Sequence, residues 1–315
     1  MRHFLSLLDL NRDELLVLLK LTGQLKRQQA RGKSSFKLAG KVVGLVFEKP
    51  SLRTRVSFEA AMAQLGGSTV FLPANEAGLG TRETIPDFAR TLCQYCDAIV
   101  LRTFAHSTVE KFAEHATVPI INGLTDYLHP CQALADLFTI HEHFGKLDGR
   151  TVVFVGDGNN VARSLAMGCG MLGIRFILAA PSAYRFDEPF RCRWRESFPN
   201  GFCEELEAPL DAVANADVIY TDVWTSMGQE AEQEVRRQAF ATFQVNESML
   251  RKAPKHAVVM HCLPAHRGEE IAGDVLDGPR SIAFQQAGNR LHAQKALLQW
   301  LLSPTESAGK KQRSR

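Results

Sequence analysis

The chain has 315 residues, of which 45% are hydrophobic and 23% charged, the usual balance of a folded protein with one large domain or two smaller ones. Its formal net charge is +3, and residues 303–315 alone hold four basic side chains and one acidic one, which is 4 − 1 = +3. A neutral body gives no support for nucleic-acid binding, and no apolar run reaches the roughly 20 residues that span a membrane. The tail 303–315 is short and polar, so we expect it to be disordered.

Cysteine usage points to a reducing compartment. The seven cysteines are an odd and scattered set, and the first residues lack the pattern of a signal peptide, so a cytoplasmic protein is expected. Cys93 and Cys96 form a single CxxC without a second pair, which favours buried helix thiols over a zinc site. No metal or other cofactor is expected.

In the first half, strands and helices alternate along the chain. An amphipathic helix is predicted to start near Asn11, and later helices follow Ser51 and cover residues 83–95 and 109–116. Strands are predicted at 40–47, 68–72, 97–102 and 118–121. This alternation predicts a parallel sheet covered on both faces. Arg102 would end one strand and Asn122 would follow the next, at the edge where open α/β sheets bind ligands.

The stretch Ser51–Arg55 has the features of a phosphate site. Pro50 ends a buried strand, and Ser51 is a good N-cap for the helix that follows. Free N–H groups and the positive end of the helix dipole attract anions there. Arginine adds forked charged donors, so Ser51, Arg53, Thr54, Arg55 and Arg102 are expected to form an anion cage. Two solvated arginines at an ordinary helix start are the alternative interpretation.

A second polar cluster follows the first sheet. Pro130 suits the first position of a helix that runs to about Phe144, with His129 near its cap and Gln132 one turn in. Both side chains would face the same sheet edge as Arg102. A capping or packed histidine is the alternative for His129. Residues 145–149 are a turn and a plausible domain boundary.

The second half repeats the α/β pattern. Strands are predicted at 151–155, 175–179, 217–221 and 257–260, and helices at 161–172, 206–214 and 291–302. The turn at 156–160 lacks the third glycine of a dinucleotide fingerprint, because Val161 takes its place, and no acidic residue ends the next strand. NAD binding is therefore not expected, and Asn160 is interpreted as a polar contact for a small ligand.

Asp222 and Cys262 each lie at the end of a predicted strand and would flank one ligand. A carboxylate there suits an ammonium group. Negative charge nearby raises the pKa of a thiol, so Cys262 is a poor candidate for a thiolate nucleophile. A buried structural thiol is the alternative. Overall we expect an α/β fold with two doubly wound parallel-sheet domains, joined by crossing helices, with two substrates meeting in the cleft between them.

Five motifs in order resemble those of the aspartate/ornithine carbamoyltransferase family, and the resemblance runs from about Phe4 to Leu302. These motifs are FEKPSLRTR, HPCQALAD, DVWTSMGQE, MHCLPAHRGEE and GNRLHAQKALL, and the third and fourth are similar to the ornithine branch of the family. The resemblance implies a carbamoyl-phosphate-binding domain at 1–144, completed by helix 291–302, and an ornithine-binding domain at 145–290. It also implies carbamoyl phosphate and L-ornithine as substrates, and a homotrimer.

The resemblance also implies a role for each site residue. Carbamoyl phosphate would be held by Ser51, Leu52, Arg53, Thr54, Arg102, His129, Gln132, Cys262, Leu263 and Arg290. Catalysis would rest on Arg102, His129, Cys262 and Arg290. L-Ornithine would be bound by Asn160, Asp222, Ser226 and Met227.

Two positions depart from the family pattern. Leu52 stands where Thr or Gly is usual, which removes a hydroxyl, and Gly288 stands where Glu is usual, two residues before Arg290. Aspartate or an acylated ornithine as the acceptor, and a binding protein without turnover, are the alternatives that remain open. Asp222 disfavours aspartate, and the presence of Arg102, His129 and Arg290 disfavours a protein that only binds.

Overall fold

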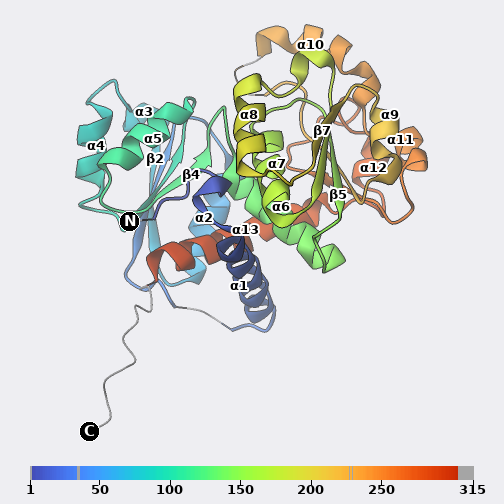
Figure 1. Ribbon diagram of the computed structural model, residues 1–315. Coiled ribbons are helices and arrows are strands. Elements are labelled where there is room, and N and C mark those ends of the chain that lie inside the picture. Colours follow the sequence, from blue (N-terminus) through green and yellow to red (C-terminus); the bar gives the residue numbers. More distant parts are fainter. Residues whose placement is uncertain (1, 34–35, 227, 229, 304–315) are drawn as a thin grey trace.

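The computed structural model describes residues 2–33, 36–226, 228 and 230–303, and each half of the chain is built on its own parallel sheet (Figure 1). The first sheet has the strand order β2-β1-β3-β4. Its strands are β1 (Val42–Phe47), β2 (Ser68–Pro73), β3 (Ala98–Arg102) and β4 (Ile120–Leu124). The helices of this half are α1 (Arg12–Ala30), α2 (Leu52–Gln64), α3 (Ala74–Ala77), α4 (Ile85–Leu92) and α5 (His106–His115).

The second sheet has the order β7-β6-β5-β8-β9, again with every pairing parallel. Its strands are β5 (Thr151–Val155), β6 (Arg175–Ala179), β7 (Cys203–Leu206), β8 (Val218–Thr221) and β9 (Val258–His261). Its helices are α7 (Asn160–Leu172), α8 (Glu188–Ser197), α9 (Pro209–Ala212), α10 (Gln233–Ala239), α11 (Glu247–Lys252) and α12 (Gly273–Leu276). Two doubly wound α/β halves were predicted, and this prediction is confirmed.

Two long helices cross between the halves. α6 (Pro130–Phe144) leads out of the first half, and α13 (Ala283–Leu302) returns from the second half and packs on α1, α2 and α6 (Figure 1). Both helices are largely buried along their length. By its packing, α13 therefore belongs to the first half, although it follows the second half in sequence.

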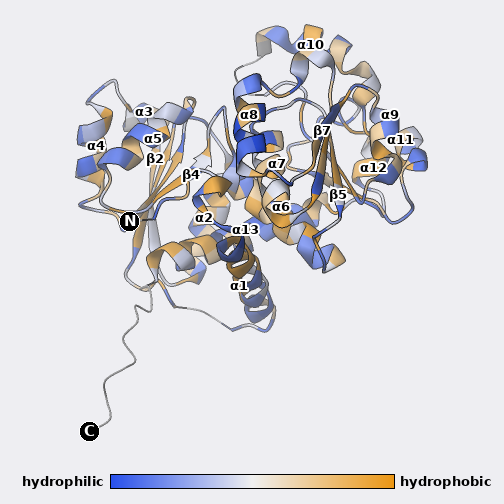
Figure 2. Cartoon of the chain, viewed as in Figure 1, coloured by the Kyte–Doolittle hydropathy of each residue, from blue (hydrophilic) through white to orange (hydrophobic). Residues whose placement is uncertain are grey.

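The hydrophobic core is continuous between the halves. One cluster joins Leu45 of β1, Leu137 of α6, Leu165 of α7 and Leu297 of α13. Two further clusters cover the other face of each sheet, so both sheets are buried on both sides, as parallel sheets require. Outer helices are polar: α8 is mostly hydrophilic (Figure 2), and Phe190 and Trp194 are its buried residues.

Three local predictions differ from the structure. α13 begins at Ala283 rather than at residue 291. The predicted start was too late because Gln286, Asn289 and Arg290 in the first turns are polar in type, although they are buried. The predicted helix at 206–214 is instead the end of β7 followed by the short α9, and α8 and β7 were not predicted. Asn122 lies inside β4, where its side chain donates to the Leu5 carbonyl at 3.0 Å, so it is not at the ligand edge.

Among the described residues, no helix combines the length and the apolar character that crossing a bilayer demands. The predicted helix start at Asn11 is confirmed, because its side chain accepts from the Glu14 N–H at 2.9 Å. Of the basic tail, residues 304–315 lie outside the described residues, as does Met227.

Candidate active site

The carboxyl ends of the strands in both halves open onto one cleft of about 1140 Å³. The strand order reverses between β1 and β3 in one sheet and between β5 and β8 in the other, which is where α/β sheets bind ligands. The cleft is lined by Ser51, Leu52, Arg53, Thr54, Arg102, His129, Gln132, Asn160, Asp222, Ser226, Cys262, Leu263 and Arg290. These residues come from the start of α2, the ends of strands β3, β8 and β9, the loops and helix starts beside them, and the interior of α13. The fold brings them together.

One end of the cleft is built to hold an anion. The Ser51 hydroxyl accepts from the Thr54 N–H at 3.2 Å and caps α2, so the N-terminus of this helix opens onto the cleft. Arg53 lies in the first turn of α2, and Arg102 ends β3 with only 5% of its surface exposed. Leu52 is 74% exposed, so its side chain projects outward and its contribution to the cleft wall comes from the helix start.

Arg290 of α13 connects α2 and α6 at the anion end of the cleft. It donates from Nη1 to Gln132 Oε1 at 2.6 Å and from Nη2 to Thr54 Oγ1 at 2.8 Å. His129 occupies the N-cap position of α6 without a side-chain cap bond, and Pro130 is at the first helical position as predicted. The backbone N–H of His129 donates to Ser164 Oγ at 2.7 Å. α2, α6 and α13 thus each contribute one polar group to the same corner.

The cations in this corner repel one another. Burial, and then the charges of Arg290 and Arg53, lower the pKa of Arg102 to about 9. Burial, and then Arg290 and Arg102, hold the pKa of His129 well below its usual value, so its imidazole is neutral at neutral pH. In the part of the chain that the structure describes, Arg102 Nε, Arg290 Nε and His129 Nδ1 are buried without a hydrogen-bond partner. An anion with several acceptor oxygens would relieve the repulsion and could accept from the unpaired arginine donors.

Arg55 does not belong to this cage, and the expectation that it would is wrong. Its Nε donates to Glu59 Oε1 at 2.9 Å, and its guanidinium stacks on Phe71, 3.8 Å from the ring centroid. Residues two apart on a helix do not share a face, so α2 cannot aim Arg53 and Arg55 at the same cleft.

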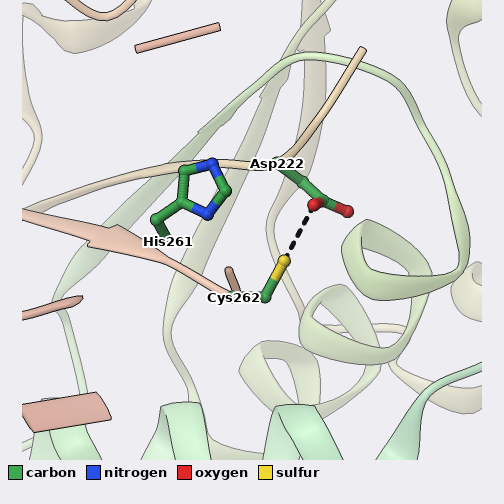
Figure 3. A group of neighbouring side chains, drawn as sticks. All are labelled: Asp222, His261 and Cys262. Atoms are coloured by element: carbon green, nitrogen blue, oxygen red, sulfur yellow. Dashed lines mark hydrogen bonds between the residues drawn. The ribbon is translucent and has the colours of Figure 1, made fainter. Parts of the chain in front are cut away.

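The other end of the cleft carries a carboxylate. Asp222 follows β8 and Cys262 follows β9, and the Cys262 thiol donates to Asp222 Oδ1 at 2.8 Å (Figure 3). Burial, and then the charge of Asp222, raise the pKa of Cys262 well above its usual value. The thiol therefore stays protonated, which agrees with the expectation that it is not a thiolate nucleophile.

His261 lies beside Asp222 and Cys262 (Figure 3), but its imidazole is buried and bonded to other protein groups. Its Nε2 is 3.1 Å from Glu270 Oε1, and its Nδ1 accepts from the Leu263 N–H at 2.8 Å. Both ring nitrogens are thus engaged, and the imidazole is not available as a metal ligand. The same bonds fix Leu263, whose backbone has a φ of +56°, at the cleft wall.

Asn159 and Asn160, in the turn after β5, make different contacts. Asn159 caps α7 and donates from Nδ2 to Asp222 Oδ2 at 2.9 Å. Asn160 lines the cleft and donates to the Thr125 carbonyl at 2.6 Å. Asn159 was not predicted as a site residue. It orients the Asp222 carboxylate, which was expected to bind the same ligand as Asn160.

Family models match nearly the whole chain. Residues 2–142 match the aspartate/ornithine carbamoyltransferase carbamoyl-P binding domain, and residues 148–301 match the Asp/Orn binding domain of the same proteins. The chain belongs to the aspartate/ornithine carbamoyltransferase family. The phosphate-motif residues and Arg102, His129 and Gln132 fall in the first matched range, whereas Asp222, Cys262 and Arg290 fall in the second.

Individual members of the family are similar over the same length. The chain is 49% identical over 308 residues to the ornithine carbamoyltransferase of Anoxybacillus flavithermus, covering 96% of each chain. It is 50% identical over 300 residues to the anabolic ornithine carbamoyltransferase of Pyrococcus furiosus, covering 94% of this chain and 95% of that one. A solved structure of the ornithine carbamoyltransferase from Pyrococcus furiosus superimposes with a TM-score of 0.92 at 49% identity, covering 96% and 97% of the two chains.

Two residues that the sequence did not single out complete this carbamoyltransferase site. Lys49 is buried in the cleft wall, pairs with Asp126 and lies 4.3 Å from the Phe104 ring centroid, which adds a cation to the anion end. Asp136 is buried directly behind Gln132. Lys49 lies two residues before Ser51 and Asp136 lies one helical turn after Gln132, both within motifs that carry the family resemblance, so both could have been found from spacing alone.

Proposed function

We propose that the protein transfers the carbamoyl group of carbamoyl phosphate to the δ-amine of L-ornithine, which gives L-citrulline and phosphate. The observation that carries this proposal is the opposition, across one cleft, of a crowded group of buried cations and a carboxylate with a protonated thiol. The first suits a phosphate and a carbonyl oxygen, and the second suits the ammonium end of an amino acid. Relatives that are about half identical carry the name ornithine carbamoyltransferase.

For carbamoyl phosphate, we assign the phosphate to the α2 N-terminus and the carbamoyl group to the α6–α13 corner. Residues 1–144 with the closing helix would form this binding domain. The phosphate ligands would be Ser51, Leu52, Arg53, Thr54 and Arg102. His129, Gln132 and Arg290 would hold the carbamoyl group, and Cys262 and Leu263 would contact it from the second half.

For L-ornithine, residues 145–290 would form the binding domain. Asp222 would pair with the α-ammonium group, since it is the carboxylate held open to the cleft by Asn159 and Cys262. Asn160, Ser226 and Met227 would bind the α-carboxylate end. The δ-amine then points toward Leu263 and the carbamoyl carbon.

The reaction needs no covalent enzyme intermediate. The neutral δ-amine attacks the carbamoyl carbon and a C–N bond forms. The tetrahedral intermediate then expels phosphate as the C–O bond breaks, and the proton of the amine passes to the departing phosphate. Arg102, neutral His129 and Arg290 stabilise the oxygens that gain charge. Positioning of the two substrates supplies much of the remaining rate enhancement. Because the free amine has a pKa of roughly 10.4, activity should rise with pH above neutrality.

We further propose a cytoplasmic homotrimer. All seven cysteines are free thiols, which suits a reducing compartment. Leu52 and Val56 of α2 and Val70 of the edge strand β2 are exposed apolar side chains, and a subunit interface would cover them. Light scattering should give a mass of three chains, and a monomer would contradict this assembly.

The decisive experiment measures product formation from carbamoyl phosphate with L-ornithine, L-aspartate and N-acetylornithine offered in parallel. We expect turnover with L-ornithine alone. Turnover with another acceptor would keep the carbamoyl-phosphate assignments and overturn those around Asp222. Phosphate binding without any turnover would show that the protein binds the ligand and does not catalyse the transfer.

A further inference from the structure

Asp136 is a fully buried carboxylate that lies behind the cleft rather than in its wall. It accepts three hydrogen bonds. Gln132 Nε2 and Gln286 Nε2 donate to Oδ1 at 2.8 and 2.7 Å, and the Tyr220 hydroxyl donates to Oδ2 at 3.0 Å. These donors come from α6, α13 and β8, so Asp136 joins both halves of the molecule directly beneath the reaction site.

Asp136 and Arg290 together decide which end of the Gln132 amide faces the cleft. A carboxylate oxygen accepts hydrogen bonds and an amide NH₂ donates them, so the NH₂ of Gln132 must point at Asp136. Its oxygen is left facing the other way, toward Arg290 Nη1 at 2.6 Å and the cleft. Arg290 can only donate, so it holds the Gln132 oxygen in the same direction. Without an acceptor at position 136, the NH₂ would lose its partner and Arg290 alone would hold the amide.

The orientation does not depend on the charge of Asp136. Gln286 Oε1 accepts from the His261 N–H at 2.9 Å, and this backbone contact forces the NH₂ of Gln286 toward Asp136 Oδ1. Oδ1 therefore remains an acceptor, and a proton on Asp136 would lie on Oδ2, toward the Tyr220 oxygen. Gln132 meets the same acceptor in both protonation states.

We propose that Asp136, acting through Gln132, makes the enzyme select a carbamoyl group over an acyl group of the same size. This inference rests on the proposed role of Gln132 in holding the carbamoyl group. An amide oxygen facing the cleft pairs with the NH₂ of carbamoyl phosphate, whereas acetyl phosphate presents a methyl group there and leaves that oxygen unpaired. Asp136 is thus a positioning residue that determines specificity without touching the substrate.

The test compares the KM for carbamoyl phosphate with the inhibition constant of acetyl phosphate in Asp136→Ala and Asp136→Asn. The alanine variant leaves the Gln132 amide held by Arg290 alone, with room to rotate, so it should lower the ratio of acetyl phosphate Ki to carbamoyl phosphate KM by up to about tenfold, which corresponds to one hydrogen bond. The asparagine variant keeps an oxygen at the Oδ1 position, held there by Gln286, and should retain the wild-type ratio. Inhibition by inorganic phosphate should be unchanged in both.

Gln132→Leu separates this inference from the assignment on which it rests. If Gln132→Leu leaves the ratio unchanged, Gln132 does not hold the carbamoyl group and the assignment fails. If Gln132→Leu lowers the ratio and Asp136→Ala does not, the role of Asp136 is refuted. If Asp136→Ala does not fold, Asp136→Ser takes its place with the same expected loss, because the shorter side chain cannot reach both Gln132 and Gln286.

Discussion

Asp222 shows how single residues prepare the cleft for a charged ligand. Cys262 and Asn159 each donate one hydrogen bond to it, at 2.8 and 2.9 Å, and fix its two oxygens. Both donors are neutral, since the pKa of Cys262 is raised by burial and by Asp222 itself. The carboxylate is therefore oriented by neighbours that leave its charge for the substrate.

Asp222→Asn should raise the KM for L-ornithine by roughly tenfold to a hundredfold, because a charge-assisted hydrogen bond contributes roughly 1.5–3 kcal/mol. The KM for carbamoyl phosphate should stay near the wild-type value. Asp148→Asn, at an exposed carboxylate outside the cleft lining, is the matched control and should change neither constant. Equal losses for both substrates would show that Asp222 supports the fold rather than the amino acid.

The buried charge of Asp136 also has a consequence for stability. Burial raises its pKa from 3.8 to about 7, against the opposing hydrogen bonds of Gln132, Gln286 and Tyr220 and the charge of Arg290. The folded state therefore holds this proton more tightly than the unfolded chain does, and ionisation lowers the free energy of unfolding as the pH rises from about 4 to about 7.

Asp136→Asn has no proton to lose in that window. Its free energy of unfolding in urea, relative to the wild type, should increase by roughly 1–3 kcal/mol between about pH 4 and about pH 7 and then level off. Parallel pH curves for the two proteins would mean that Asp136 ionises normally in the folded state.

At the scale of secondary-structure elements, the site is assembled from helix starts and from one helix interior. α2 and α6 begin at the cleft, with Ser51 and His129 at their caps, whereas α13 passes the cleft and presents Arg290 from within. Gly288 lies in that same stretch of α13, and a Cβ added there would meet nothing within 4 Å. Neither packing nor backbone conformation requires a glycine at this position.

Gly288→Ala should therefore stabilise the protein by about 0.5–1 kcal/mol, the difference in helix propensity, without changing turnover. Gly168→Ala, in the interior of α7, is the matched opposite, because its added Cβ would lie 2.4 Å from Leu137 Cδ1. That variant should lose on the order of 1–3 kcal/mol. Thermal unfolding of both would check the pair, and a destabilised Gly288→Ala would show that the helix needs flexibility beside Arg290.

At the scale of the whole molecule, the anion end is under electrostatic strain that a ligand relieves. Arg53, Arg102 and Arg290 come from three elements. Burial, and then the charges of neighbours that include Arg53, lower the pKa of both Arg102 and Arg290. Because α13 and α6 connect both halves, an anion bound in this corner stabilises the contact between them as well as the first domain. Ligand binding and overall stability should therefore be coupled.

Inorganic phosphate at a hundred times its dissociation constant should add about 2.7 kcal/mol to the free energy of unfolding and raise Tm by several degrees. Arg53→Ala should abolish most of that rise. Arg55→Ala removes the same charge from the same helix, but its guanidinium stacks on Phe71 outside the cleft, so the rise should persist. Equal behaviour of the two variants would mean that phosphate acts through general charge screening.

The sequence was sufficient wherever the signal is local. The caps at Asn11, Ser51 and His129 and the polar strand ends at Arg102, Asp222 and Cys262 follow from neighbouring residues, and the structure places them as expected. Contacts between distant residues could not be predicted: Asp136 meets Tyr220 and Gln286, which are 84 and 150 residues away. The start of α13 was missed for the same reason, because its buried polar residues are paired with partners far along the chain.

The position of Arg290 also sets a condition on how the enzyme is made. A chain emerging from the ribosome can build the first sheet early, yet α1, α2 and α6 pack on α13, which follows the whole second sheet in the sequence and is made after it. An incomplete chain would hold the phosphate motif without Arg290 and without the core residues of α13. Prematurely terminated products should thus be inactive. They should also expose the apolar surface that α13 covers, to which chaperones and proteases bind.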